Sequence, residues 1–459
     1  MSAPRRIVLA GALAQKPGKA GHAWVFLQYL LGLRDLGYRP LLIDQIQEPL
    51  QDVQRHWFHE VLCHPVQPLE GILLDEMGHP VAFQRLRRAT PAASTNRPAH
   101  DPGMGGQLTG GDSQGPIPSR ADCRALIEDS LGLINVQGFL RDAELLQAAR
   151  RRLFLDIDPG FTQMWQDLGL TDFLDVHDAY ATVGGRIGQP DCPIPTCGKD
   201  WIHILPPVHL PSWPAGGLHD RSASQPEAGG QPPAEAPPGE GALTSVISWR
   251  GAYGPLEYKG RTYRLRVHEF RRFWDLPAML RGEAEAAPRP TDSGAERNRD
   301  SEIASASSRG IAMQLAIDID PADEEDRQSL ISRGWDLLSA DSVGGDLESY
   351  RDYLRRSLGE FLVAKNIYVD TRSGWFSDRS ACYLASGRPV LAQDTGLGDL
   401  LPTNRGLLTF TSAHQAVRQI RLLLDQYPVH ARAARRIAED HLDAEKILPR
   451  LLHQAGVDA

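Results

Sequence analysis

Residues 7–44 read IVLAGALAQKPGKAGHAWVFLQYLLGLRDLGYRPLLID, and their alternation of apolar and polar segments is the main evidence on fold class. The apolar run Ile7–Ala14 predicts a buried strand, and the polar, glycine-containing segment Gln15–Gly21 predicts a loop. Apolar residues recur with helical spacing over Ala23–Leu36, and Leu41–Asp44 reads as a second buried strand. A strand, a loop, a helix and a strand in this order form one βαβ unit with parallel strands.

The same alternation recurs farther along the chain. Further buried strands are predicted at Leu153–Asp156, Leu243–Trp249, Ala312–Ile319, Phe361–Val369 and Pro389–Gln393. Asp320-Pro321, followed by acidic residues, predicts a helix start. The sequence therefore predicts an α/β fold of two Rossmann-like, doubly wound parallel-sheet domains that face a cleft.

Three stretches, 89–122, 215–242 and 281–310, are rich in Gly, Pro, Ser and Ala and contain no Phe, Trp or Tyr. Such segments bury too little apolar surface to offset the entropy lost on ordering, so we predict three disordered inserts. Prolines around residues 206–214 indicate an extended crossover between the domains. We accordingly expect an N-terminal domain over 1–210, a linker over 211–242 and a C-terminal domain over 243–459.

Charge and cysteine content exclude several classes of protein. The net charge is −9, from 49 basic and 58 acidic residues, so the chain lacks the basic character of a nucleic-acid-binding protein. Five sparse cysteines predict reduced thiols in a cytoplasmic protein. We expect no metal site, although His56, His59, Cys63 and His64 form a weak candidate cluster. No transmembrane segment is expected, and peripheral membrane contact stays open.

The loop after the first strand carries the first candidate functional residues, Gly18, Gly21 and His22. Open α/β sheets bind ligands at the carboxyl ends of their strands, and glycine allows a backbone to approach a ligand closely. The helix start adds amide donors there, and an imidazole is suited to general-base chemistry near neutral pH. In the alternative interpretation His22 only caps the helix and packs on the sheet.

Two segments resemble known glycosyltransferases. Gly21-His22, the helix that follows, Gly37-Tyr38 and the strand Leu41–Asp44 resemble the opening of GT-B superfamily glycosyltransferases. The segment 374–392, with Ala385-Ser386-Gly387-Arg388-Pro389-Val390, resembles the donor-binding segment of group 1-type members. The resemblance covers roughly 1–88, 123–214 and 243–459, and it implies a nucleotide-sugar donor bound by the second domain and an acceptor bound by the first.

The residues of the second segment support a ligand site by themselves. Ser377 is a plausible N-cap, so the first-turn amides of the helix would face the cleft and bind a diphosphate or ribose. Arg379 would supply charge, and Asp378 would accept from a hydroxyl. The turn after the next strand adds the further candidate donor-binding residues Asp394, Thr395 and Gly396. The alternative is ordinary helix capping followed by a surface turn.

Two further groups complete the candidate site. The resemblance implies a cation pair after the strand that opens the second half, and Arg250 and Lys259 are the candidates, although Lys259 is equally plausible as a solvated turn residue. Fixed cations would stabilise the charge that develops on the leaving nucleoside diphosphate. Asp158, after the strand ending at Asp156, would orient an acceptor hydroxyl or support His22, or would simply cap the next helix.

The sequence thus predicts a metal-independent glycosyltransferase with no cofactor, a nucleotide-sugar as substrate, an unidentified acceptor hydroxyl, and His22 and Asp158 as catalytic residues. One departure from the family stands out. Many retaining members carry two glutamates seven residues apart, and here Gly374 and Cys382 take those positions. Two alternatives therefore stay open, a nucleotide-sugar epimerase of the same fold and a GT-B-like binding protein without catalytic activity.

Overall fold

The computed structural model describes residues 5–63, 68–85, 116–216, 241–251, 253–285 and 311–457. The three predicted inserts fall mostly outside these ranges, but parts of their described edges form regular secondary structure. Helix α3 (Arg120–Glu128) takes residues 120–122 from the first insert, and α7 (Leu276–Glu285) takes 281–285 from the third. Those two boundaries were wrong. Ser119 and Asp122 form a capping box, and this signal starts α3 inside the segment that composition marked as an insert.

The first domain is built on one eight-stranded sheet with the order β4-β3-β2-β1-β5-β6-β7-β8, parallel except for β4. Its strands are β1 (Arg6–Gly11), β2 (Arg39–Gln45), β3 (Glu70–Leu74), β4 (Pro80–Gln84), β5 (Leu133–Val136), β6 (Arg152–Asp156), β7 (Ala179–Thr182) and β8 (Trp201–His203). The helices of this part, besides α3, are α1 (Ala20–Asp35), α2 (Asp52–Leu62), α4 (Ala143–Ala148) and α5 (Phe161–Asp167).

The second domain has a six-stranded parallel sheet with the order β13-β12-β9-β14-β15-β16. Its strands are β9 (Ala242–Ser248), β12 (Ala312–Asp318), β13 (Asp336–Ser339), β14 (Gly359–Leu362), β15 (Val390–Gln393) and β16 (Leu407–Phe410), and a separate hairpin pairs β10 (Leu256–Tyr258) with β11 (Arg261–Tyr263). Two doubly wound sheets of this kind confirm the predicted fold class.

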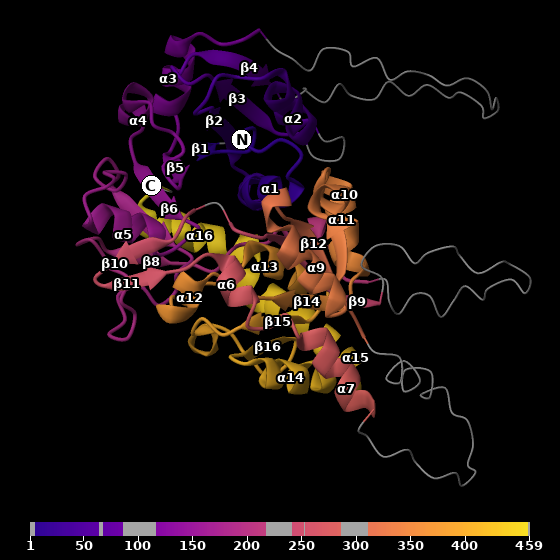
Figure 1. The fold of residues 1–459 in the computed structure, drawn as a ribbon. Coiled ribbons are helices and arrows are strands. Elements are labelled where there is room, and N and C mark those ends of the chain that lie inside the picture. The colour runs from indigo at the N-terminus through magenta and orange to yellow at the C-terminus, as the bar shows by residue number, and fades with distance from the viewer. Residues whose placement is uncertain are drawn as a thin grey trace, which may run out of the picture.

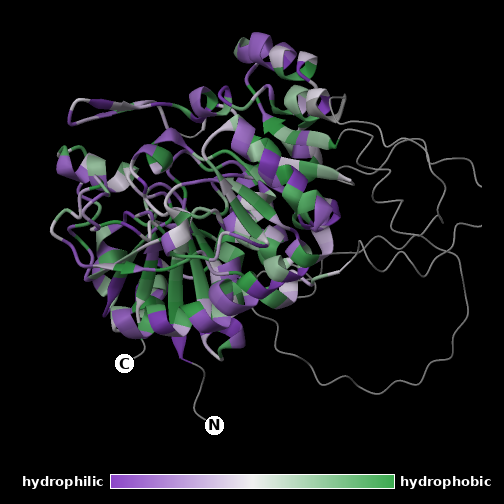
Figure 2. Ribbon diagram, turned by 90° about the horizontal axis from the view of Figure 1, so that it is seen from below, coloured by the Kyte–Doolittle hydropathy of each residue, from purple (hydrophilic) through white to green (hydrophobic). Residues whose placement is uncertain are grey.

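The helices of the second part connect these strands. Besides α7, they are α6 (Arg266–Phe270), α9 (Glu324–Ser332), α10 (Ala340–Gly344), α11 (Leu347–Arg356), α12 (Asn366–Asp370), α13 (Asp378–Ala385), α14 (Ala413–Asp425), α15 (Tyr427–Ile437) and α16 (Ala444–Ala455). Figure 2 shows the apolar strands in the interior and the more polar helices around them. One buried apolar cluster runs from α1 to α11 and α13, and includes the close ring contacts of Trp213 with Trp24 and Tyr350. The two domains therefore share a core.

The last helix returns to the first domain. In Figure 1 the carboxyl terminus lies near β5 and β6, and α16 lies beside the first sheet. Gly32 in α1 packs against Ala444 and Leu448 of α16, and Arg151 donates to the Ala455 carbonyl at 2.7 Å. The first sheet ends at His203 and the second begins at Ala242. The last helix packs on the first domain, which the predicted domain bounds did not anticipate.

Several local predictions are confirmed and one is wrong. Asp320 accepts a hydrogen bond from the Ala322 amide, and Ser377 caps α13, as expected from their positions. The predicted strand Phe361–Val369 stops at Leu362, where β14 ends, and α12 begins at Asn366. An apolar run of that length is compatible with one long strand. It is equally compatible with a short strand that is followed by a loop and a short helix.

Candidate active site between the two domains

The carboxyl ends of both sheets border the same interdomain region. Strand order reverses between β1 and β5 in the first sheet and between β9 and β14 in the second. Loops diverge at such reversals and leave a crevice, which is where open α/β sheets bind ligands. Contacts between the loop after β6 and α12, and between the loops after β7 and β15, show that these edges meet.

The loop after β1 is held in a fixed shape. Asp44, at the end of β2, is fully buried and accepts from the Ala14 amide at 2.5 Å. Burial raises the pKa of Asp44 to about 7 despite that hydrogen bond. Gly18 has φ of +68°, and Gly21 approaches the Tyr350 ring of α11 so closely that an added Cβ would lie 3.1 Å from it. The two glycines thus shape the loop and allow close packing of the domains.

His22 lies in the first turn of α1 and contacts the loop. Its Nε2 lies 2.8 Å from the Ala12 carbonyl, so the neutral ring donates this proton and leaves Nδ1 as the basic nitrogen. Burial, reinforced by the charge of Lys16, lowers the pKa of His22 to about 3. The imidazole is therefore neutral at pH 7, but it is a much weaker base than the sequence alone suggested.

Asp158 does not cap the helix that follows it, because Gly160 occupies the N-cap position of α5. Its carboxylate instead accepts from two residues of the second domain, Lys365 Nζ at 2.5 Å and the hydroxyl of Tyr368. The capping interpretation was wrong, and the interaction with the second domain explains why a carboxylate occupies this position.

Two cations that the sequence analysis did not select lie near Asp158. Lys365 is 15% exposed, and burial lowers the pKa of its ammonium while Asp158 raises it. Arg266, at the start of α6, has no hydrogen-bond or ion-pair partner among the described residues, and its Nε is buried without an acceptor. Burial and the nearby charge of Arg379 lower the pKa of Arg266, while the charges of Tyr368, Asp158 and Glu360 raise it. A buried guanidinium nitrogen without an acceptor is costly, and an anionic ligand that accepts from it would remove that cost.

Lys16, in the loop after β1, contributes charge to the same region. Lys16 is exposed, but its charge affects the pKa of both His22 and Lys365. Partial desolvation lowers the pKa of Lys16, and Asp158 raises it. We call Lys16, Arg266 and Lys365 the crevice cations. One sequence signal was available for them, because Lys365 interrupts an otherwise apolar buried stretch, where a charged residue needs an explanation.

The predicted cation pair lies apart from the crevice cations. Arg250 is 54% exposed and makes a bidentate ion pair with Asp323 through contacts of 2.7 and 2.8 Å. Lys259 is 68% exposed, lies over the Tyr258 ring and reaches Asp167 at 3.4 Å. Both cations therefore form ion pairs at the surface, and neither pairs with Asp158.

At the start of α13, Ser377 and Arg379 have mainly structural contacts. Ser377 accepts from the Arg379 amide as the N-cap. The Arg379 guanidinium donates to the buried Glu360 carboxylate at 2.6 Å and to the Val246 carbonyl at 2.5 Å. Burial alone would lower the pKa of Arg379, but Glu360 raises it overall. This arginine is neutralised inside the second domain.

The turn after β15 is also internally satisfied. Asp394 Oδ1 accepts from the amides of Gly396 and Leu397, and the buried Thr395 hydroxyl donates to the Trp375 carbonyl at 2.7 Å. Gly396 has φ of +92°, which a side chain would rarely adopt. These residues join the turn to the segment before α13.

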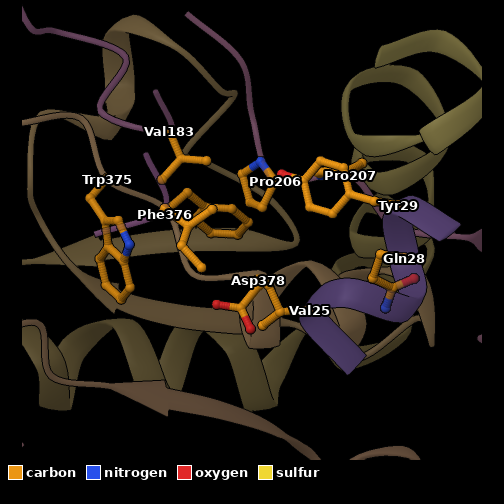
Figure 3. A pocket seen from close by; sticks show the side chains of 10 residues that line it. Val25, Gln28, Tyr29, Val183, Pro206, Pro207, Trp375, Phe376 and Asp378 are labelled. Atoms are coloured by element: carbon orange, nitrogen blue, oxygen red, sulfur yellow. The ribbon is translucent and has the colours of Figure 1, made fainter. Parts of the chain in front are cut away.

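Asp378 lies at an interdomain pocket. The pocket is lined by Val25, Gln28, Tyr29, Ile157, Val183, Pro206, Pro207, Trp375, Phe376 and Asp378. Figure 3 shows the Asp378 carboxylate among apolar side chains from both domains. Burial raises the pKa of Asp378. Ser377 and Arg379 are not among the residues that line this pocket.

The described residues contain no group of three or more His, Cys, Asp and Glu side chains arranged to hold a metal ion. Residue 64 of the weak candidate metal cluster lies outside the described ranges. No disulfide pairs any two of the five cysteines, all of which lie within the described ranges. In the part of the chain that the structure covers, no helix combines the length and apolar character needed to span a membrane.

Comparison with known proteins gives structural matches only. No family model matches the chain, and no curated protein matches its sequence. An alpha-glucosyltransferase solved with UDP and a mismatched 13-mer DNA superposes with a TM-score of 0.53 and 10% identity, over 99% of this chain and 100% of that one. TarM superposes with a TM-score of 0.52 and 8% identity, over 98% of both chains. The chain has the GT-B fold.

In the GT-B fold of this chain, the two glutamate positions of the family motif are structural. Gly374 has φ of +73°, and its amide donates to the Thr395 carbonyl at 2.7 Å. Cys382 is buried in α13 and accepts from the Gln28 amide of α1 at 3.3 Å. Neither position therefore supplies a carboxylate to the crevice.

Proposed function

We propose that the protein is a glycosyltransferase that transfers a sugar from a nucleotide-sugar donor to an acceptor hydroxyl. One observation carries this proposal: Arg266 Nε is buried without an acceptor, and Arg266 makes no hydrogen bond or ion pair with a carboxylate among the described residues, although its charge lies near that of Lys365. A diphosphate is an anion of the required charge, and guanidinium groups bind phosphate oxygens through paired hydrogen bonds. The GT-B fold and the UDP found with the superposed alpha-glucosyltransferase support the same conclusion.

In this proposal the crevice cations act on the leaving group. As the acceptor oxygen bonds to the anomeric carbon, the bond from that carbon to the diphosphate breaks, and the diphosphate takes the electron pair. Lys16, Arg266 and Lys365 would stabilise the resulting charge, which is larger in the transition state than in the bound donor. We propose that this neutralisation needs no metal ion, so transfer should persist with a chelator present.

The acceptor hydroxyl must also lose a proton. Asp158 and His22 are the candidates, and the pKa of about 3 for His22 makes its imidazole a weak proton acceptor. Asp158 is the stronger candidate, because its carboxylate lies against Lys365, and movement of Lys365 toward a bound diphosphate would free the carboxylate for the hydroxyl. The DNA in the superposed complex is a ligand of that protein, and the net charge of −9 gives no reason to expect a nucleic-acid partner here.

The experiment is a titration with UDP and UDP-sugars, followed by an assay for transfer. We expect UDP to raise the melting temperature of the wild type, and Arg266→Ala to reduce UDP affinity by about 10- to 100-fold through loss of a charged contact. Arg250→Ala is the matched control, because Arg250 is exposed and paired with Asp323. Equal loss of affinity in the two variants would contradict the assignment of the crevice cations.

A second candidate function is nucleotide binding without transfer. The absence of both family glutamates, at Gly374 and Cys382, favours it. UDP would then bind as above, but no sugar would be transferred to any member of an acceptor panel. Conversion of a UDP-sugar without an acceptor would instead indicate an epimerase.

A further inference from the structure

Arg186, in the loop after β7 of the first domain, makes a dense set of contacts with the second domain. Its side chain is 9% exposed, and its guanidinium pairs with Asp191 of its own domain and with Asp399 of the second. Arg186 Nε also donates to the Arg372 carbonyl at 3.1 Å. The Arg186 side chain therefore joins the two domains by contacting the Asp399 carboxylate and the Arg372 carbonyl of the second domain.

The backbone at the same point also crosses between the domains. The Arg186 amide donates to the Ser373 carbonyl at 3.0 Å, and Gly184 forms an antiparallel bridge with Trp375. Two glycines leave space for Arg186. An added Cβ would lie 3.0 Å from its Cγ at Gly374 and 2.5 Å from its Cδ at Gly396. Side chain and backbone together form a closely packed interdomain contact.

Both segments that rest on Arg186 belong to the proposed donor side. Residues 373–377 lead directly into α13, and residues 394–399 follow β15. They are joined to each other, because the Gly374 amide donates to the Thr395 carbonyl and the Thr395 hydroxyl donates to the Trp375 carbonyl, both at 2.7 Å. We call these two segments the donor-side loops. Their position depends on a residue of the opposite domain.

We propose that Arg186 is a positioning residue that holds the donor-side loops in place, so that a first-domain side chain sets nucleotide affinity in the second domain. The consequence for affinity rests on the proposed function. Removing the guanidinium leaves Asp399 without this partner and opens a gap beside two glycines. A loop packed on one buried side chain gains conformational freedom when that side chain is lost, and a ligand must then order the loop again.

The test combines hydrogen exchange with UDP titration on the full chain. In Arg186→Ala we expect amides of the donor-side loops to exchange faster, while those of β14 and α14 stay unchanged, and the Kd for UDP to rise about 10-fold, a typical coupling between sites. Arg186→Lys should recover part of both effects. Arg372→Ala is the matched control. The Arg372 side chain is half-exposed and contacts Asp191 at 3.4 Å, but it makes no ion pair with Asp399 among the described residues.

Unchanged exchange in the donor-side loops of Arg186→Ala would overturn the proposal. If Arg186→Ala does not fold, Asp399→Asn removes the second-domain partner alone, and the same two measurements decide. If the wild type does not bind UDP, the proposed function fails, while the exchange rates still show whether Arg186 positions the loops.

Discussion

Lys365 Nζ lies 2.5 Å from Asp158 Oδ2, and this contact joins α12 of the second domain to the loop after β6 of the first. Both side chains are largely buried, at 15% and 19% exposed. The Phe161, Tyr253 and Tyr368 rings lie within 5.1–5.4 Å of the ammonium. The carboxylate and the three rings stabilise the buried ammonium. An anion of higher charge, such as a diphosphate, would compete with Asp158 for it.

This ion pair should show strong energetic coupling. Asp158→Asn and Lys365→Met should each lower the free energy of unfolding by roughly 3 kcal/mol, because each leaves one buried charge without its partner. The double variant should lose less than the sum, since it removes both charges. Denaturant unfolding of the four proteins measures the coupling, and additivity within about 0.5 kcal/mol would contradict it.

His22 should remain neutral throughout the physiological pH range. Its pKa is about 3 in the folded protein and near 6.5 in the unfolded chain, so the unfolded state takes up a proton first as pH falls. The contribution of His22 to stability is complete above about pH 6.5 and is lost between about pH 6.5 and 3. Labelling the histidine ring carbons for NMR, with His22→Gln to assign the signal, should show no titration between pH 5 and 8. A midpoint near 6.5 would contradict the desolvated environment.

Asp44 should have the opposite dependence on pH. Its folded pKa of about 7 lies above the unfolded value near 3.8, so the folded state keeps its proton while the unfolded state loses it. The contribution of Asp44 to stability should therefore fall as pH rises from about 4 to 7. Asp44→Asn keeps the acceptor for the Ala14 amide and removes the ionisation. Its free energy of unfolding relative to wild type should rise by roughly 2–4 kcal/mol between pH 4 and 8. A pH-independent difference would disagree with this assignment.

Two glycine substitutions should separate packing from helix propensity. An added Cβ at Gly32 of α1 would lie 2.8 Å from Ala444 Cβ and 2.7 Å from Leu448 Cδ1, so Gly32→Ala should push α16 away and destabilise by about 1–3 kcal/mol. Gly282 lies in α7, and no atom of the described residues outside its own helical turn lies within 4 Å of an added Cβ. Gly282→Ala should therefore stabilise by up to about 1 kcal/mol. Thermal unfolding of both variants makes the comparison, and a stabilising Gly32→Ala would show that α16 does not pack tightly there.

Local residue patterns predicted much of the fold. The capping residues Asp320 and Ser377 and the alternation of strands and helices follow from interactions within a few residues, which one sequence displays directly. The predicted fold class and the opening βαβ unit are confirmed, and both could be predicted because they depend on the same local patterns. The insert edge near α3 was wrong because composition over a long stretch obscured the local Ser119–Asp122 signal.

The sequence by itself determined two α/β domains and the loops that border a crevice between them. Tertiary structure alone decided which charges are available in that crevice. The sequence does not distinguish Arg250 and Arg379 from Arg266. In the folded chain the first two form ion pairs with carboxylates from other elements, while Arg266 forms none among the described residues. Likewise, the sequence suggests that Asp158 is a helix cap. In the fold it contacts Lys365, which lies 207 positions away in the sequence. The physical reason is that burial and ion pairing depend on neighbours in space, and the folded chain alone defines those neighbours.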